Sequence, residues 1–233
     1  MTNRRLGILG GTFDPIHCGH LDLGRAAASA LALTDIVVIT SNIPPHRPQP
    51  VASSYQRFAM VALAIAGVEH WRASDIELAI GAPSYTTGTL QRFHESGLAA
   101  TEIFFIIGTD AFAEIETWKD FPAILDRANF AVVSRPGLPA RDMPRRLPAI
   151  AARMVTAGEL GSRQTPLIFL IDATTADVSA TAIRHRVAAG GSIAGLVPDA
   201  VGQHIEQHGL YSSSFAEADT HRTSQAGRLH GQD

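Results

Sequence analysis

The feature that most constrains the fold of this chain is a series of short apolar runs that alternate with helix-like segments. Strands that are apolar along their whole length are typical of parallel sheets, because helices cover both faces of such a sheet. The runs occupy residues 6–9, 35–40, 102–107, 129–133 and 167–171. Helices are expected over about residues 19–33, from Ser53 onward, over about 87–96 and over about 181–189.

This alternation predicts an α/β fold, in which right-handed crossovers build a doubly wound, Rossmann-like open parallel sheet with helices on both faces. Ligands of such sheets bind beyond the carboxyl ends of the strands. Residues 136–148 contain four prolines and are expected to form an exposed connection. After Tyr211 the apolar periodicity stops, so residues 212–233 are predicted to be a disordered tail that follows one domain, residues 1–211.

The composition excludes several classes of protein. The 233 residues are 45% hydrophobic with a net charge of −3, which argues against a protein that holds nucleic acid through bulk positive charge. The single cysteine cannot form an intrachain disulfide, and the apolar runs are too short to cross a membrane, so a cytoplasmic location is expected. The single lysine, Lys119, follows Trp118, which excludes a phosphate-binding loop that needs lysine after glycine. Arginine, histidine and backbone N–H groups must therefore bind any phosphate.

Residues 10–20 are the most informative segment, because they join the first expected strand to the first expected helix. Doubly wound folds bind nucleotide phosphates at this position. Gly10 and Gly11 allow the backbone to approach a ligand closely. His17 and His20 are three residues apart at the helix entry, so both imidazoles can face one pocket and donate hydrogen bonds to phosphate oxygens.

Two other interpretations of this segment exist. The histidines alone fit an ordinary polar helix start equally well. A metal site made by His17, Cys18 and His20 is less favoured, because neighbouring His17 and Cys18 share a tetrahedral site poorly and the chain has no second cysteine. Cys18 is expected to pack as a small apolar residue.

A second segment, residues 178–184, lies at the start of the last expected helix. Ser179 and Thr181 can cap this helix, whose free N–H groups then point toward anions. Arg184 follows one turn later, where a guanidinium can clamp a phosphate. With this second motif present, the phosphate-binding interpretation of His17 and His20 becomes the favoured one.

These motifs resemble those of a known superfamily. Gly11-Thr-Phe-Asp-Pro-Ile-His-Cys-Gly-His20 resembles the signature of the HxGH nucleotidyltransferases, and residues 178–184 resemble their ISxTxxR motif, with Val178 in the first position. Within the superfamily, the chain is similar to bacterial nicotinate mononucleotide adenylyltransferases over about residues 4–211. The segments that carry this similarity are residues 44–47, 84–90, 107–110, Trp118 and 135–137.

The resemblance implies a reaction and a set of partners. The reaction is transfer of the adenylyl group of ATP to nicotinate mononucleotide, giving deamido-NAD (nicotinate adenine dinucleotide) and pyrophosphate. The implied cofactor is Mg²⁺, held mainly by the ATP phosphates, with no metal ligand from the protein. The expected partners are ATP and nicotinate mononucleotide, with no nucleic acid and no membrane, and homo-oligomerisation is left open.

The resemblance also implies roles for individual residues. The catalytic residues would be His17, His20 and Arg184. ATP would be bound by Gly10, Gly11, Thr12, Phe13, His17, His20, Gly108, Asp110, Ser179, Thr181 and Arg184. The mononucleotide would be bound by Arg47, where many members of the family have lysine, by backbone N–H groups of Tyr85 and Thr86, by stacking on Trp118, and by Arg135.

Several alternatives stay open at this point. The acceptor could be another phosphate, such as nicotinamide mononucleotide or phosphopantetheine, or the chain could be a non-catalytic nucleotide-binding module. Trp118 could be a core residue, and Asp110 could cap a helix. Arg57 and Arg135 could be structural or could face the substrate. Arg141, Arg145 and Arg146 are expected to form a solvated surface.

Overall fold

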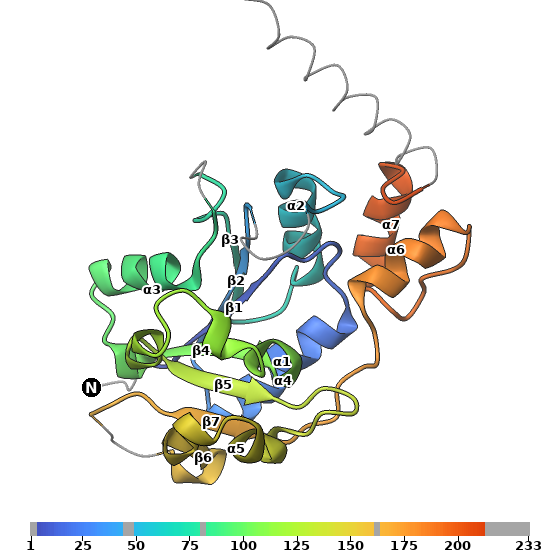
Figure 1. Ribbon diagram of the computed structural model, residues 1–233. Helices are drawn as coiled ribbons and strands as arrows, with labels where there is room; N and C mark the ends of the chain where they lie inside the picture. Colours follow the sequence, from blue (N-terminus) through green and yellow to red (C-terminus); the bar gives the residue numbers. More distant parts are fainter. Residues whose placement is uncertain (1–3, 44–48, 80–82, 161–163, 213–233) are drawn as a thin grey trace, which may run out of the picture.

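The computed structural model describes residues 4–43, 49–79, 83–160 and 164–212 (Figure 1). Within these ranges one all-parallel sheet has seven strands, in the order β3-β2-β1-β4-β5-β7-β6. The strands are β1 (Leu6–Gly11), β2 (Asp35–Thr40), β3 (Trp71–Ser74), β4 (Ile103–Gly108), β5 (Asn129–Val133), β6 (Met154–Thr156) and β7 (Ile168–Ile171). The doubly wound α/β sheet predicted from the sequence is confirmed.

The five apolar runs are the five inner strands β2, β1, β4, β5 and β7, as predicted. The sequence did not predict the two edge strands, β3 and β6. These are short and only half-buried, with an exposed residue in each, because an edge strand has a neighbour on one side only. They therefore lack the continuous apolar run that marks an inner strand.

The helices are α1 (Cys18–Leu31), α2 (Ser54–Ala64), α3 (Thr86–Glu95), α4 (Thr109–Phe112), α5 (Met143–Arg146), α6 (Ala180–Ala188) and α7 (Asp199–Gln207). Four of them, α1, α2, α3 and α6, begin and end close to the predicted residues, whereas α4, α5 and α7 were not predicted. Short 3-10 segments lie at Ala100–Glu102, Ile115–Thr117, Ala123–Asp126, Ala140–Asp142, Pro148–Arg153 and Ala157–Glu159. Ser53 caps α2 as expected, since its hydroxyl accepts a hydrogen bond of 3.3 Å from the Gln56 N–H.

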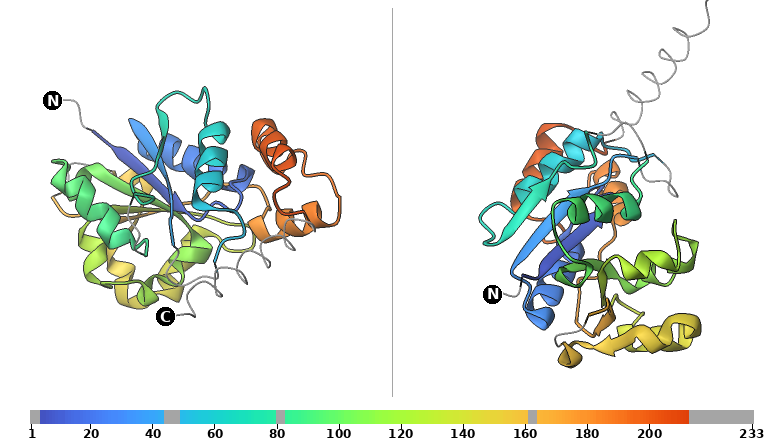
Figure 2. Two further views of the ribbon diagram at one scale, coloured as in Figure 1. Left: turned by 90° about the horizontal axis from the view of Figure 1, so that it is seen from above. Right: turned by 90° about the vertical axis from the view of Figure 1, so that its left-hand side faces the viewer.

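The sheet separates two hydrophobic cores. Leu9 of β1 and its register partner Ile106 of β4 face the core that contains α1, α2, α6 and α7. Ile8 and its partner Phe105 face the opposite core, which contains α3 and α5. The views in Figure 2 show these two helical layers on opposite sides of the sheet. Both faces of the inner strands are therefore buried, which explains their uninterrupted apolar sequences.

The expectation that residues 136–148 form an exposed connection was only partly correct, because exposed residues alternate there with buried ones. This segment folds into a 3-10 turn followed by α5, and Ala140, Met143 and Leu147 are buried against the second face of the sheet. The prolines are compatible with this structure because Pro139, Pro144 and Pro148 lie at or next to the starts of helical turns. Proline is tolerated there because the first N–H groups of a helix have no intrahelical partner.

All strands run in one direction, so their carboxyl ends lie along one edge of the sheet. The order of strands reverses between β1 and β4, which makes the loops after these two strands the topological switch point. No helix in the described ranges is long and apolar enough to cross a membrane. The predicted tail lies outside the described residues, apart from Ser212.

Candidate active site at the carboxyl edge of the sheet

The loop after β1 brings the first motif to the switch point. A Cβ atom on Gly11 would lie 2.8 Å from the ring of Phe13, so this close turn requires glycine. Phe13 itself has a φ of 51°, an uncommon value for an aromatic residue. The turn leads to His17, which precedes the first residue of α1. Gly10, Gly11, Thr12 and Phe13 therefore all lie at the predicted site.

His17 and His20 lie against each other at the start of α1. Their rings are stacked with centroids 3.7 Å apart, and Phe13 contacts His20 edge-on at 5.0 Å. The backbone N–H of His17 donates a hydrogen bond of 3.3 Å to Nδ1 of His20. Because Nδ1 of His20 accepts this bond, the proton of the neutral ring is on Nε2.

Both histidines are neutral at pH 7. Burial and the nearby Arg135 guanidinium lower the pKa of His17 to about 4, against a smaller opposing effect of Asp22. Burial, His17 and Arg135 together lower the pKa of His20 well below its usual value. The pair can therefore donate hydrogen bonds to phosphate oxygens without adding positive charge of its own.

Arg135 lies between the two motifs. It follows β5, and its Nη2 donates a hydrogen bond of 3.2 Å to the carbonyl of Val178, the first residue of the second motif. A Cβ atom on Gly19 would lie 2.8 Å from Nη1 of Arg135 and 3.2 Å from Nδ1 of His17, so only glycine leaves room for these groups. Both of these nitrogens are buried and have no hydrogen-bond partner in the described part of the chain.

The second motif starts α6 as predicted. The hydroxyl of Ser179 caps the helix by accepting a hydrogen bond of 3.2 Å from the Ala182 N–H. Thr181 does not cap; its hydroxyl accepts a hydrogen bond of 3.2 Å from Nη2 of Arg184. Nη1 of Arg184 donates to the carbonyl oxygen of Asp14 at 2.8 Å, which joins the two motifs directly.

Gly108 and Asp110 lie at the end of β4, beside the first motif. A Cβ atom on Gly108 would lie 2.6 Å from Oδ1 of Asp110 and 3.1 Å from Cγ of Arg135, so the strand end is closely packed. The Asp110 side chain is 63% exposed, and its Oδ2 lies 4.0 Å from Nε of Arg135. An exposed carboxylate in this position can accept hydrogen bonds from ligand hydroxyl groups.

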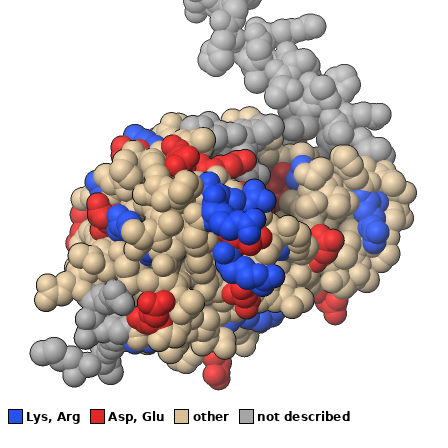
Figure 3. All heavy atoms as spheres, turned by 60° about the horizontal axis from the view of Figure 1, so that its bottom comes forward, with Lys and Arg blue, Asp and Glu red and all other residues tan. Residues whose placement is uncertain are grey.

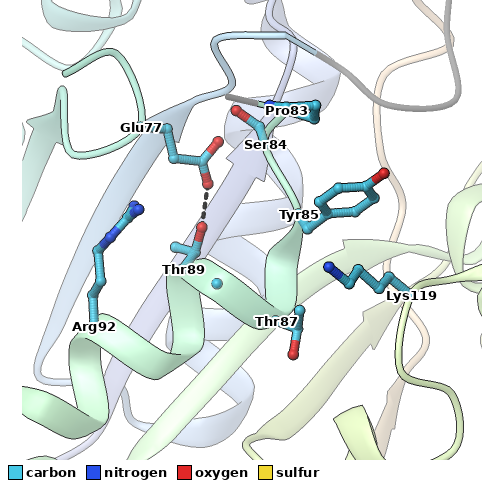
Figure 4. A pocket seen from close by; sticks show the side chains of 9 residues that line it. Glu77, Pro83, Ser84, Tyr85, Thr87, Thr89, Arg92 and Lys119 are labelled. Carbon is cyan, nitrogen blue, oxygen red and sulfur yellow. Dashed lines mark hydrogen bonds between the residues drawn. The ribbon is translucent and has the colours of Figure 1, made fainter. Parts of the chain in front are cut away.

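A cavity lies at the start of α3 (Figure 4). Tyr85, which precedes the helix, and Lys119 form one side of it, with Nζ of Lys119 4.6 Å from the centroid of the tyrosine ring. Glu77 lies on the other side, where it accepts a hydrogen bond from Thr89, and burial raises its pKa. Trp118 comes directly before Lys119 and is half-buried.

The hydrogen bonding at the start of α3 changes the prediction that the backbone N–H groups of Tyr85 and Thr86 bind a ligand. The Tyr85 N–H already donates a hydrogen bond of 3.1 Å to the Pro83 carbonyl, so it is engaged within the protein. Thr86 is the first residue of α3, where helical N–H groups have no intrahelical partner. Trp118 packs edge-on against Phe105, with ring centroids 6.0 Å apart, which gives it a core contact as well as an accessible part.

The comparisons with known proteins agree with this geometry. The cytidylyltransferase-like family matches residues 8–186. A protein of Desulfatibacillum aliphaticivorans with the name "probable nicotinate-nucleotide adenylyltransferase" is 39% identical over 217 residues, which cover 89% of this chain and 99% of its own. A Pseudomonas aeruginosa protein with the same name is 38% identical over 208 residues, 89% of this chain and 97% of its own.

The chain belongs to the nicotinate-nucleotide adenylyltransferase family. Solved structures support the fold. Nicotinic acid mononucleotide adenylyltransferase from Plasmodium falciparum, complexed with NaAD, has a TM-score of 0.69 at 16% identity. That match covers 89% of this chain and 97% of the other. The complex of the same enzyme with APC gives a TM-score of 0.68 at 15% identity.

Three residues at the site were not among the predicted ones. Asp22 of α1 accepts a hydrogen bond of 3.0 Å from the Ala176 N–H, which ties the segment just before the second motif to the first helix across 154 residues. Asp14 contacts Arg184 across 170 residues. Lys119 was not among the predicted site residues, although its position beside Trp118 was a signal for it, and it lines the cavity at the start of α3.

The structure separates the roles of the arginines. Arg57 is 1% exposed and donates hydrogen bonds to the carbonyls of Thr12, at 2.6 Å, and Ser41, at 2.7 Å, so it is structural. Arg141, Arg145 and Arg146 are exposed as expected, and Arg141 pairs with Asp172. Figure 3 shows basic and acidic side chains close together on the face that comes forward when the bottom of the view in Figure 1 is turned toward the reader. Arg47 lies outside the described residues.

His17, Cys18 and His20 are the residues of the alternative metal-site interpretation. The described residues contain no group of three or more His, Cys, Asp and Glu side chains placed to hold a metal ion. The Cys18 thiol is half-buried and donates to the Gly195 carbonyl at 3.6 Å. Burial and the nearby Asp22 raise the pKa of this thiol.

The low pKa of His17 predicts how stability depends on pH. Between pH 6.5 and about 4 the unfolded chain binds a proton at His17 that the folded chain does not, so stability is lost as the pH falls through this range. In His17→Asn, the loss of unfolding free energy between pH 7.5 and pH 5 should be smaller by about 1–2 kcal/mol, measured by urea denaturation. His185→Asn is the control, because His185 is exposed. If the unfolding free energy of His17→Asn depends on pH as strongly as that of wild type, the prediction is wrong.

Proposed function

We propose that this chain transfers the adenylyl group of ATP to nicotinate mononucleotide, giving nicotinate adenine dinucleotide and pyrophosphate. The observation that carries the proposal is the convergence of the two motifs at the switch point, through the hydrogen bonds from Arg184 to Asp14 and from Arg135 to Val178. The relatives described above carry the name of this activity over nearly the whole chain. The cavity at the start of α3, lined by Tyr85 and Lys119 among others, supports a separate site for the acceptor.

The reaction needs no covalent enzyme intermediate. An oxygen of the mononucleotide phosphate attacks the α-phosphorus of ATP, the bond from this phosphorus to the bridging oxygen breaks, and pyrophosphate leaves with the electron pair. The protein therefore acts by alignment and by stabilising charge on the phosphates. We assign this charge stabilisation to the neutral donors His17 and His20 and to the Arg184 guanidinium. Mg²⁺ bound to the ATP phosphates would neutralise further charge.

The residues predicted to bind ATP lie along one edge of the sheet, which supports this assignment. Gly10, Gly11, Thr12 and Phe13 follow β1, Gly108 and Asp110 follow β4, and Ser179 and Thr181 start α6. The unpartnered buried nitrogens of His17 and Arg135 lie next to the same glycine. Buried polar atoms of this kind call for a partner, which a ligand or a water molecule at the site would supply.

We propose that the acceptor binds at the cavity at the start of α3, where Thr86 and Trp118 are the chain neighbours of the lining residues Tyr85 and Lys119. We propose that the pyridine stacks on Trp118 and that the nicotinate carboxylate receives hydrogen bonds at Thr86, where the helix N-terminus also favours an anion. Lys119 adds a positive charge at this end of the cavity. Tyr85 contributes its ring, which Lys119 contacts. Arg47 and Arg135 remain proposed contacts of the mononucleotide phosphate.

Incubation with ATP, Mg²⁺ and each pyridine mononucleotide tests the activity. We expect pyrophosphate release with nicotinate mononucleotide and a dinucleotide product identified by mass spectrometry. Faster turnover with nicotinamide mononucleotide would change only the acceptor, and turnover with phosphopantetheine alone would replace it. ATP binding without pyrophosphate from any acceptor would identify a non-catalytic module.

Three other expectations stay predictions. They are a cytoplasmic location, a catalytic domain of residues 1–211 and a disordered tail after it. Homo-oligomerisation stays open.

His20→Ala tests the first motif. The substitution removes an Nε2–H donor that we assign to the triphosphate, so kcat should fall by about 10²–10³-fold, as for loss of one oxyanion-hole donor. Pyrophosphate release measures this loss. His70→Asn is the matched control, because His70 is exposed and precedes β3 at the opposite edge of the sheet. Unchanged turnover in His20→Ala would remove the central assignment of this motif.

Lys119→Met tests how the carboxylate is recognised. The methionine keeps an unbranched side chain but removes the charge, so the ratio of kcat/KM for nicotinate over nicotinamide mononucleotide should fall by about fivefold, the size expected of a partly exposed ion pair. Lys119→Arg should retain the preference. A ratio that is the same in wild type and Lys119→Met would show that the helix N-terminus alone selects the acid.

A further inference from the structure

The carboxylate of Asp14 is a buried hub within the first motif. Asp14 is 5% exposed. Its Oδ2 accepts a hydrogen bond of 2.8 Å from the Val51 N–H, and its Oδ1 accepts one of 3.0 Å from the Ala52 N–H and one of 2.8 Å from the Tyr211 hydroxyl. Taking a carboxylate out of water is costly unless donors surround it, and here three donors do so.

Asp14 also holds Arg184 of the second motif. Nη1 of Arg184 donates to the Asp14 carbonyl at 2.8 Å and lies 3.8 Å from Oδ2 of the same residue. Nη2 donates to the Thr181 hydroxyl. The Arg184 side chain is 25% exposed, so it is anchored on one side and accessible on the other. The orientation of the Asp14 carboxylate therefore determines how closely Arg184 is drawn toward the protein.

Tyr211 reaches this hub from the far end of the described chain. It lies four residues after the end of α7 and 197 residues from Asp14, and its ring is 4% exposed within the core on the α1 side of the sheet. Its φ of 64° is a left-handed value that aromatic residues rarely adopt. Burial and Asp14 raise the pKa of Tyr211, so its hydroxyl keeps the proton that it donates.

We propose that Tyr211 is a positioning residue for ATP: its hydroxyl holds the Asp14 carboxylate in the orientation that leaves Arg184 directed to the phosphates. This rests on the proposed function only through the role of Arg184 at the triphosphate. When the hydroxyl is absent, Oδ1 of Asp14 keeps the Ala52 N–H but loses its second donor. The carboxylate then turns toward Arg184, shortens the 3.8 Å ion pair and withdraws the guanidinium from the nucleotide.

Tyr211→Phe separates this role from a purely structural one, because the ring that packs in the core is retained. We expect KM for ATP to rise by about tenfold, the size of one hydrogen bond to a charged group, while KM for nicotinate mononucleotide changes by less than about twofold. Tyr55→Phe is the matched control, since Tyr55 is 74% exposed, and it should leave both constants unchanged. Equal changes for both substrates in Tyr211→Phe would overturn the proposal.

A double-mutant cycle tests whether Tyr211 acts through Arg184. In the Arg184→Lys background, where the two-nitrogen contact with Asp14 and Thr181 is lost, Tyr211→Phe should change KM for ATP by less than about twofold. Additive effects would contradict the proposal. If Tyr211→Phe does not fold, Asp14→Asn tests the same contact from the other side. The substitution removes the charge that would draw Arg184 away from the phosphates, so KM for ATP should not rise more than KM for the mononucleotide. An Asp14→Asn variant in which KM for ATP alone rises would overturn the proposal.

Direct titration separates this proposal from the proposed function. Calorimetry with an ATP analogue that has a methylene bridge between the α- and β-phosphorus measures nucleotide binding without any acceptor. Wild type that binds the analogue but forms no pyrophosphate contradicts the proposed function, and the Tyr211→Phe titration still decides the role of Tyr211. Wild type that is active, with equal affinity for the analogue in Tyr211→Phe, contradicts the role of Tyr211 alone.

Discussion

The parallel pairing of β1 with β2 on one side and β4 on the other is the constraint on which the rest of the structure depends. Because the strands share one direction, the glycine-rich end of β1, the end of β4 at Gly108 and the Arg135 segment after β5 all reach the same edge of the sheet. The reversal of strand order between β1 and β4 opens this edge to a ligand. Residues that are far apart in sequence become neighbours there without any long loop.

Charge is distributed unevenly over this edge. The stacked His17 and His20 are neutral, because burial and Arg135 disfavour their protonated forms. The permanent charges belong to the guanidinium groups of Arg135 and Arg184, which donate hydrogen bonds to the backbone carbonyls of Val178 and Asp14 respectively. An arginine keeps its charge under such packing, whereas a lysine loses it more readily. This division explains how a chain with a single lysine can be equipped to bind phosphates.

The sequence predicted most of the scaffold and the candidate residues, but not their contacts. Inner strands were predictable because burial on both faces leaves an uninterrupted apolar run. The edge strands β3 and β6 and the separate buried residues Ala140, Met143 and Leu147 carry no such signal. The Tyr85 N–H was expected to face a ligand, yet it is bonded to Pro83. Arg57 could not be assigned from sequence, because the carbonyls that its guanidinium contacts, those of Thr12, Ser41, Asn42 and Ala52, are brought together only by the fold.

The sequence by itself determined the parallel α/β sheet, the two motifs at helix starts and the reliance on arginine and histidine for phosphate. These properties follow from local spacing, periodicity and composition. Only the tertiary structure decided the protonation of the histidines and the joining of the motifs through Arg184 and the Asp14 carbonyl. It also placed Tyr211 on the carboxylate of Asp14, 197 residues away. Burial and contacts between distant segments depend on how the elements pack, and no local pattern in a single sequence encodes them.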